Sequence, residues 1–336
     1  MLHFDKQLIT NSKLHAQKWQ ELSLNRRYFA QREQELVGNA ITKPQPWLQL
    51  DSVTARVMRD NAGQVIMGDL MPLATTVNIG KVVHGYRFNS DGANTTQRSI
   101  SGQKPQPMDK GSYDFRGVPV PIFTNGVGRE WREWNVLQND DFDAWAEDVE
   151  KATYDMRTDM ANYLLDGDST IQFDGYQGYG IRSAPYTQSV DMTGIDLTTA
   201  TTVQWENFLA QTLGGAADDN LVTEPMNLYV SPEIARNLDL PYNQDEYLSG
   251  TRFQRLATNR RINEIKVDYA LSGNEWTAFV PNRRYIRPVV GMPVGTQMMP
   301  RTYPMDNYQM LIMGAMGFEI VADANGRSAV FYGVGS

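Results

Sequence analysis

The sequence predicts an α+β fold organised around one long helix. From Asn139 to Gly167, apolar residues recur at alternating three- and four-residue steps, which places them in one stripe along an α-helix. The stripe consists of Phe142, Trp145, Val149, Ala152, Met156, Met160 and Tyr163. Elsewhere, short apolar runs bounded by Gly, Pro and Asn predict strands. A strand followed directly by a helix in MNLYVSPEIARNLDL, which begins at Met226, adds an α/β segment.

Both ends of the long helix are encoded locally. Asn139, Asp140 and Asp141 supply an N-cap and negative charge at the positive end of the helix dipole, and Gly167 follows the last apolar residues as a C-capping glycine. About 25 residues at roughly 1.5 Å each give a rod of about 37 Å, well above the usual length in globular proteins. Its other faces carry charged residues, so we expect a half-buried helix and not a membrane span.

Composition excludes several classes of site. The 336-residue chain is 41% hydrophobic, which supports a substantial core, and it has no cysteine for disulfides, thiolate zinc sites, iron–sulfur clusters or cysteine nucleophiles. The chain has only three histidines, His3, His15 and His84, so a histidine metal site or a His-dependent catalytic triad is not expected. No paired acid and base accompanies a pocket motif. We therefore predict no enzymatic activity, no cofactor and no metal.

Charge and hydropathy limit the classes of partner that this chain can have. A formal net charge of −8 argues against a protein that grips nucleic acid through counterion release. There is no apolar run of 18 residues and no signal-peptide pattern, so we expect neither a membrane partner nor secretion. One local concentration of basic residues stands out, five arginines without interleaved aromatics, and it favours a solvated face or a subunit contact to the acidic helix over a nucleic-acid site. They are Arg260, Arg261, Arg283, Arg284 and Arg287.

The N-terminal region is predicted to begin with a helix from Leu14 to Val37. Its loosely apolar face needs a partner, which is either its own domain or a neighbouring subunit reached by a mobile arm. Lys43 to Pro46 then predicts an extended linker. From there to about Val82, the runs VTARVM, QVIMGDL and TTVNIG are interpreted as strands separated by turns.

The stretch from Val83 to Pro121 is rich in Gly, Pro, Ser, Asn and Gln and nearly free of large aliphatic side chains. It cannot form a core by itself. Weak alternation from Val83 to Phe88 and from Tyr113 to Val120 predicts two strands of a long excursion that leaves the domain. The alternative is an irregular surface loop.

The second half of the chain alternates helices and strands. The segment DGDSTIQFDGYQGYGIRS after the long helix is interpreted as plain turns, because its spacing fits neither a phosphate loop nor a calcium loop. A short helix is predicted from Thr202 to Leu213 and is expected to stop at Gly214 and Gly215. Ser231, Pro232 and Glu233 form an N-cap and N1 pattern for a further helix.

The last third is predicted to be mostly loop and strand. A polar loop is expected from Asn243 to Ala257, followed by strands from Ile265 to Leu271 and from Trp276 to Val280. Apolar runs on both sides of Ala324-Asn325-Gly326 predict a C-terminal β hairpin, because Asn-Gly supplies the positive φ that its turn needs.

Taken together, the order of these parts resembles the major capsid proteins of tailed bacteriophages, whose Hong Kong 97-type capsid fold is shared by bacterial encapsulin shells. The resemblance is architectural and covers nearly the whole chain. Its more specific pieces are the long helix with its turn-rich exit and the strand-Ser-Pro-Glu-helix segment. It implies an α+β, Hong Kong 97-like fold with an N-arm, an extended β-hairpin loop, a long spine helix in a peripheral domain and an α/β axial domain.

The resemblance also implies a division of the chain. The parts are an N-terminal arm at 1–50, a first part of the peripheral domain at 51–81, the extended loop at 82–124, the peripheral domain with the spine helix at 125–199, the axial domain at 200–287, and a return to the peripheral domain with a C-terminal β hairpin at 288–336.

The function implied by the resemblance is structural: self-assembly into hexamers and pentamers of an icosahedral shell that encloses double-stranded DNA. The protein would be a component of the virion capsid, assembled in the cytoplasm of a bacterial host. Expected partners are other copies of itself, a portal, a decoration protein as a further candidate and, since no charged helical segment precedes the arm, a separate scaffolding protein. DNA would be contacted weakly and without sequence specificity.

Residues expected to contact neighbouring subunits lie in the arm and the excursion. They are Trp19, Leu22, Phe29, Leu36, Phe88, Lys104, Lys110, Tyr113, Phe115 and Arg116. Some members of the resembled family form Lys–Asn isopeptide cross-links. Lys104 and Lys110 lie in the corresponding loop, but neither an Asn partner nor an assisting Glu is matched by motif.

Two other classes of function stay open from the sequence. One is an encapsulin-type shell around a cargo enzyme, against which the long arm and large excursion weigh. The other is a soluble enzyme using carboxylates such as Glu130 and Asp166, which lacks a paired acid and base.

Overall fold

The computed structural model describes residues 63–89, 100–101, 113–133, 144–242 and 250–335, all within one compact unit that runs from Val57 to Ser336. The predicted arm, its helix and its linker lie outside the described residues. So do the expected contact residues Trp19, Leu22, Phe29, Leu36, Lys104 and Lys110.

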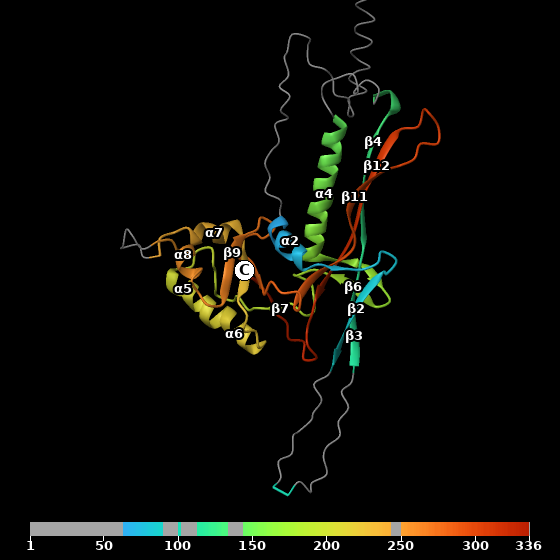
Figure 1. The fold of residues 1–336 in the computed structure, drawn as a ribbon. Coiled ribbons are helices and arrows are strands. Elements are labelled where there is room, and N and C mark those ends of the chain that lie inside the picture. The colour runs from blue at the N-terminus through green and yellow to red at the C-terminus, as the bar shows by residue number, and fades with distance from the viewer. Residues whose placement is uncertain (1–62, 90–99, 102–112, 134–143, 243–249, 336) are drawn as a thin grey trace, which may run out of the picture. The chain divides into compact units, whose positions relative to one another are not determined.

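Two sheets make up most of the described unit (Figure 1). The four-stranded sheet has the order β1 (Thr75–Thr76), β11 (Ile286–Met298), β12 (Tyr308–Ile320) and β4 (Ile122–Arg129). The five-stranded sheet has the order β7 (Gln188–Ser189), β13 (Val330–Val334), β10 (Glu275–Phe279), β8 (Met226–Val230) and β9 (Ile262–Val267). Strands β4, β12 and β11 pair antiparallel in that order, whereas β1 pairs parallel with β11, and β8 and β9 also form a parallel pair.

The long helix α4 spans Ala144–Asp166, 23 residues, and lies alongside β4, β11 and β12 (Figure 1). Met156, Met160 and Ala152 of the predicted stripe are buried in one cluster with Ile312 and Met316 of β12, as expected from the helical spacing. Gly167 has a φ of 71°, the left-handed conformation predicted for the C-capping position. The predicted N-cap lies outside the described residues.

The excursion has the two predicted strands. β2 (Val83–Asn89) and β3 (Tyr113–Pro119) pair antiparallel, from Val83 opposite Pro119 to Asn89 opposite Tyr113. The alternation in their sequences therefore marked real strands, and the alternative of an irregular loop is wrong for these residues.

The turn-rich segment after α4 is instead a β hairpin. β5 (Gly167–Phe173) and β6 (Tyr176–Tyr179) pair antiparallel around Asp174 and Gly175, whose φ values are 49° and 81°. Two consecutive positive φ values are typical of the primed turns that join adjacent strands. The prediction of plain turns was wrong because the glycines obscured the strand pattern between them.

Two segments, one predicted as a strand and one as a loop, are helical. QVIMGDL forms α2 (Gln64–Leu70), with Ile66, Met67 and Leu70 buried, and is followed by the 3₁₀ turn η1 (Met71–Leu73). Part of the expected polar loop forms α8 (Arg252–Leu256), whose N-terminus has a capping box between Thr251 and Gln254.

The helix from Thr202 also departs from its prediction. It continues as α5 (Thr202–Asn207), a π-helical segment η2 (Phe208–Thr212) and α6 (Leu213–Asp219), and so passes through both glycines. A Cβ on Gly214 would lie 2.9 Å from the carbonyl oxygen of Leu209. This glycine therefore permits close packing inside a helix and does not end it.

The predicted cap before the next helix is confirmed. α7 (Pro232–Leu238) has Pro232 at its start, and the backbone N–H of Ile234 donates to Oγ of Ser231 at 3.2 Å. This helix follows β8, as the strand-helix pattern predicted.

The predicted C-terminal hairpin is wrong. A turn is present, with Gly326 at φ 78° and its N–H donating to the carbonyl of Asp323 at 3.1 Å, but the strands that flank it belong to different sheets. β12 pairs with β11 and β4, whereas β13 pairs with β10 and β7. The chain therefore passes from the four-stranded sheet to the five-stranded sheet at this turn, and β13 does not pair with β12.

Candidate subunit-contact surface

The exposed side of the excursion base carries aromatic residues. Tyr113 and Phe115 occupy alternate positions of β3, so they share a face, and both are exposed. The guanidinium of Arg87 lies 4.8 Å from the ring centroid of Tyr113. Phe173 of β5 is a further exposed ring in this part of the fold. Large exposed aromatic side chains are typical of surfaces that another chain covers.

Arg116 and Phe88 are instead engaged within the chain. The guanidinium of Arg116 lies 4.0 Å from the ring centroid of Phe88 and 4.2 Å from that of Tyr186. Its Nη1 donates to the carbonyl oxygens of Ala322 and Asp323 at 3.2 and 3.0 Å. Arg116 thus ties β3 to the segment that follows β12.

The other excursion strand is anchored through a buried carboxylate. Glu319 of β12 is fully buried and accepts from Nε of Arg287 at 2.6 Å, with Nδ1 of His84 3.2 Å away. Burying a carboxylate without a partner would be strongly unfavourable, so this pairing fixes β2 and β11 against it. Nearby, the hydroxyl of Tyr86 donates to the carbonyl of Ile320 at 3.4 Å, and burial raises the pKa of this hydroxyl.

A cavity of about 280 Å³ lies beside these anchors, lined by Phe115, Arg116, Tyr176, Tyr186 and Phe318 among others. Its walls are largely aromatic and apolar, with one guanidinium. Such a site can receive an apolar side chain. In the described part of the chain, no group of three or more His, Cys, Asp and Glu side chains is placed to hold a metal ion.

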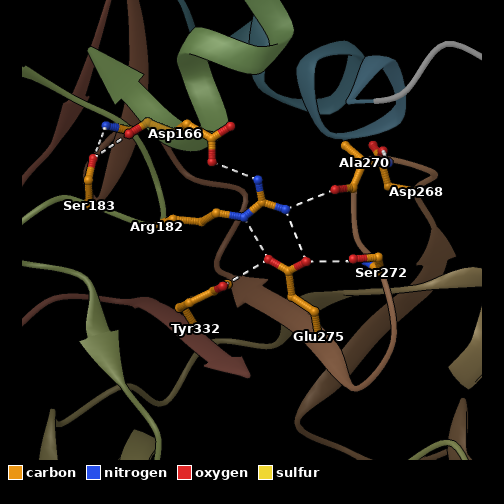
Figure 2. Close-up of polar contacts among 9 residues, drawn as sticks. Asp166, Arg182, Ser183, Asp268, Ala270, Ser272, Glu275 and Tyr332 are labelled. Atoms are coloured by element: carbon orange, nitrogen blue, oxygen red, sulfur yellow. Dashed lines mark hydrogen bonds and ion pairs between the residues drawn. The ribbon is translucent and has the colours of Figure 1, made fainter. Parts of the chain in front are cut away.

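A polar network joins α4 to the five-stranded sheet. Figure 2 shows the guanidinium of Arg182 between the carboxylates of Asp166, at the end of α4, and Glu275 of β10. The distances are 2.6 Å from Nη1 to Asp166, and 2.6 and 3.0 Å from Nε and Nη2 to the two oxygens of Glu275. Burial opposes the charge of Arg182, but the hydrogen bonds to both carboxylates outweigh it and raise its pKa.

Other groups complete this network. The hydroxyl of Tyr332 on β13 donates to Glu275 at 2.8 Å, the N–H of Ser272 donates to it at 3.1 Å, and Nη2 of Arg182 donates to the carbonyl of Ala270 at 2.8 Å (Figure 2). Glu275 therefore has its lone pairs satisfied, which a buried charge requires. Asp166, considered above as a catalytic carboxylate, has a structural role in this network.

Helix α2 is held by acidic residues that link it to the same sheet. Asp268, fully buried, accepts from the backbone N–H of Gly63 at 2.6 Å and of Ile66 at 3.1 Å, and so caps the helix from 202 residues away. Asp69 of α2 accepts from Nζ of Lys266 at 2.8 Å and from the hydroxyl of Tyr229 at 2.5 Å. Burial and the hydrogen bond to Asp69 raise the pKa of Tyr229.

These contacts surround an apolar core that the two sheets share. Ile66 and Leu70 of α2, Leu164 and Leu165 of α4, Tyr229 and Phe279 of the five-stranded sheet, and Phe318 and Ile320 of β12 are buried in one cluster. The rings of Tyr229 and Phe279 stack with their centroids 4.9 Å apart. The junction is therefore packed and hydrogen bonded at once.

Some of the five arginines singled out in the sequence make contacts within the fold. Arg261 pairs with Asp218 at 2.8 Å, Arg287 pairs with Glu319, and Nε of Arg283 donates to Oγ1 of Thr75 at 3.1 Å. Three of the five arginines therefore have a partner within this chain.

The sequence did not predict the polar contacts that join distant segments. Arg182 and Glu275 are 93 residues apart, and His84 and Glu319 are 235 apart. No local signal marks such pairs, because each partner looks like an ordinary surface residue within its own segment.

Among the described helices, none combines the length and apolar composition needed to cross a bilayer.

Comparison with known proteins gives a family and a fold. A family model described as "Family of unknown function (DUF6260)" matches residues 38–333. A comparison with curated proteins gives no match.

Solved structures match nearly the whole chain. The capsid of Myoviridae phage XM1 aligns with a TM-score of 0.62 and 13% identity, covering 88% of this chain and 99% of that one. Mycobacterium phage Bobi gives a TM-score of 0.57 at 11% identity, covering 86% and 96%, and a virus-like particle from Pyrococcus furiosus gives 0.51 at 16%, covering 80% and 92%. The α+β, Hong Kong 97-type capsid fold expected from the sequence is confirmed.

Proposed function

Because the chain belongs to the DUF6260 family of unknown function and has the Hong Kong 97-type fold, we propose that it is the major capsid protein of a tailed bacteriophage. It assembles with copies of itself into hexamers and pentamers of an icosahedral shell that encloses double-stranded DNA. The observation that carries this proposal is the match to the capsid of phage XM1 over 88% of this chain and 99% of that one.

The described contacts support a structural role. The excursion is anchored at its base by Arg116, Tyr86 and the Glu319 pair, so its two strands leave the fold from a fixed position. Tyr113 and Phe115 on its exposed face are then available to a neighbouring subunit, as proposed from the sequence. The Arg182 network and the cap on α2 stabilise the packing of the two sheets against each other, as a structural subunit requires.

We assign the domains from these sheets. The four-stranded sheet with α4 corresponds to the peripheral domain and β2–β3 to the base of the extended loop. The five-stranded sheet with α5 to α8 corresponds to the axial domain, which extends beyond residues 200–287 to include β7 and β13. An N-terminal arm at 1–50 completes the proposed subunit.

Further partners follow from the same proposal. A portal, a separate scaffolding protein and a decoration protein would act with this chain in the host cytoplasm, and the product would be the virion capsid. The formal net charge of the chain is −8, so the chain as a whole repels phosphate. Because tight binding by counterion release needs Lys or Arg contacts to phosphate, we expect weak and non-specific contact with packaged DNA.

Electron microscopy and sedimentation of the purified protein, alone and with its scaffolding partner, test the proposal. We expect closed shells with hexameric and pentameric capsomers, and particles from infected cells should protect DNA from nuclease. A protein that stays monomeric in both preparations would contradict the proposal. Particles that contain a cargo enzyme in place of DNA would identify an encapsulin-type shell instead.

A further inference from the structure

A cleft of about 380 Å³ lies between the last turns of α4, the start of β4 and strand β5, and is called here the α4–β5 cleft. Three of its lining side chains are carboxylates: Asp159 and Asp166 come from α4, and Asp168 comes from β5. None of its lining residues is basic. The cleft is therefore acidic and open to a ligand that brings positive charge.

The negative charge of the α4–β5 cleft is only partly compensated within the chain. Asp166 pairs with Arg182, but this guanidinium is shared with Glu275 (Figure 2). Asp159 has no hydrogen-bond or ion-pair partner among the described residues. The last turn of α4 also carries no basic residue, although a cation there would be favoured by the negative end of the helix dipole. A bound cation would offset this charge.

A buried hydroxyl borders the same cleft. Tyr163 lines it and is only 6% exposed, and its hydroxyl has no hydrogen-bond partner in the described part of the chain. Burial, together with the negative charge of Asp168, raises the pKa of this hydroxyl. Asp168 uses Oδ1 to accept from the hydroxyl and the N–H of Thr170 at 2.7 and 2.8 Å, and these bonds lower the pKa of its carboxyl. A ligand with N–H donors would satisfy the Tyr163 oxygen and the free Asp168 oxygen together.

The spacing of the carboxylates selects the kind of cation. Asp159 and Asp166 are seven residues apart on α4, about 10.5 Å along the helix axis, which is too far for one ammonium group to bridge. A lysine side chain would therefore leave a second carboxylate unpaired. The lining also includes Ile122, Phe123 and Ile171, whose apolar side chains suit methylene groups and not a hydrated metal ion. A methylene chain that carries several ammonium groups matches both features.

We propose that the α4–β5 cleft binds an aliphatic polyamine, whose ammonium groups pair with Asp159 and Asp168 and whose methylene groups lie against Phe123 and Ile171. The hydroxyl oxygen of Tyr163 accepts a further hydrogen bond from an ammonium group. The inference goes beyond the proposed function and does not depend on it, because every residue of the cleft belongs to one chain.

Isothermal titration calorimetry of the full-length subunit with spermidine tests the proposal, at a salt concentration of about 0.15 M that screens distant charges. We expect saturable binding of one spermidine per chain. Asp159→Asn and Asp168→Asn should each weaken it by about fivefold, as expected for the loss of one exposed ion pair. Both variants should fold normally, because Asp159 has no partner to lose and an asparagine at 168 still accepts from Thr170.

Asp155→Asn is the matched control. Asp155 is exposed on α4 one turn before Asp159, but it does not line the cleft. Its substitution removes the same charge from the same helix, so it should change the affinity by less than about twofold.

Carbodiimide coupling locates the bound amine directly. A carbodiimide activates a carboxylate, the primary amine of spermidine then forms an amide with it, and the carboxylate oxygen leaves with the carbodiimide as a urea. Mass spectrometry should find this amide at Asp159 or Asp168 in excess over Asp155. Equal weakening by all three substitutions, equal coupling at Asp155, or displacement of spermidine by an equal concentration of Mg²⁺ would show non-specific attraction of cations and overturn the inference. The proposed function would stand in each case, because assembly tests it separately.

Discussion

At the scale of single residues, Arg182 has the clearest consequence for stability. Its guanidinium bridges Asp166 and Glu275, and the Glu275 side chain is only 7% exposed. Removing one member of a buried ion pair leaves the other charge without compensation, which costs more than the pair itself contributes. The fold therefore depends on Arg182 more than its position in a loop suggests.

We expect Arg182→Met to lower the free energy of unfolding by about 3 kcal/mol, since Glu275 would remain buried and unpaired. Urea denaturation of isolated subunits measures the change. Arg236→Met is the matched control: its side chain is 76% exposed and its pair with Glu233 spans 3.5 Å, so its effect should stay within about 0.5 kcal/mol. Equal effects of the two substitutions would show that the Arg182 network does not stabilise the fold.

Tyr332 makes the same network sensitive to alkali. Burial and the hydrogen bond to Glu275 raise the pKa of its hydroxyl from 10.0 to about 12. Between these values the unfolded chain loses this proton and the folded chain keeps it, so rising pH favours unfolding. This contribution to stability is complete below pH 10 and is lost as the pH approaches about 12.

The free energy of unfolding should accordingly fall between pH 10 and about 12, and less steeply in Tyr332→Phe than in wild type. Burial also raises the pKa of Tyr163 and Tyr229, so some decline should persist in the variant. Chemical denaturation at a series of pH values, with tyrosinate absorbance followed in parallel, measures both quantities. An identical pH slope in the two proteins would contradict this role of Tyr332.

At the scale of elements, the exit of α4 into β5 depends on Gly167. Its φ of 71° belongs to the left-handed region, and a Cβ there would lie 2.5 Å from the amide nitrogen of Gly180. Gly175 in the turn of the same hairpin has a φ of 81° but no atom within 4 Å of an added Cβ. The two glycines thus share the backbone requirement and differ in packing.

Substituting alanine at each position separates these terms. Gly175→Ala should cost about 1–2 kcal/mol, the penalty for a left-handed alanine. Gly167→Ala should cost more than about 3 kcal/mol, because backbone must also move away from the new methyl group. Denaturant titration of both variants gives the difference, and similar losses would mean that the β5–β6 hairpin accommodates the added atom freely.

At the scale of the whole molecule, the anchored excursion should be covered only in the assembly. Tyr113 and Phe115 are exposed in the single chain, and the sequence between β2 and β3 is too polar and too rich in Gly and Pro to bury its own apolar surface. A neighbouring subunit would supply the missing contacts, with each exposed ion pair adding at most about 1 kcal/mol.

Trypsin should therefore cut free subunits after Arg98 and Lys110 faster than it cuts the same bonds in shells. The rates can be followed by mass spectrometry of the released peptides. Equal rates in free subunits and in shells would place this stretch outside the subunit contacts.

The sequence by itself determined those features that a few consecutive residues encode. The burial of Met156 and Met160 follows from helical spacing, the end of α4 from Gly167, the start of α7 from Ser231 and Pro232, and the strands β2 and β3 from short-range alternation. In each case the governing interactions join residues a few positions apart, so the pattern and its cause lie in the same segment.

Only the tertiary structure decided which segments meet. The turn at residues 323–327 is locally encoded, yet β12 and β13 separate into different sheets because each finds its hydrogen-bond partners far along the chain. Likewise QVIMGDL becomes helix α2 where Asp268 caps it and a shared core covers Ile66 and Leu70. A strand's neighbour, a helix's distant cap and a buried ion pair such as Arg182–Glu275 depend on the packing of the whole unit, which no local pattern records.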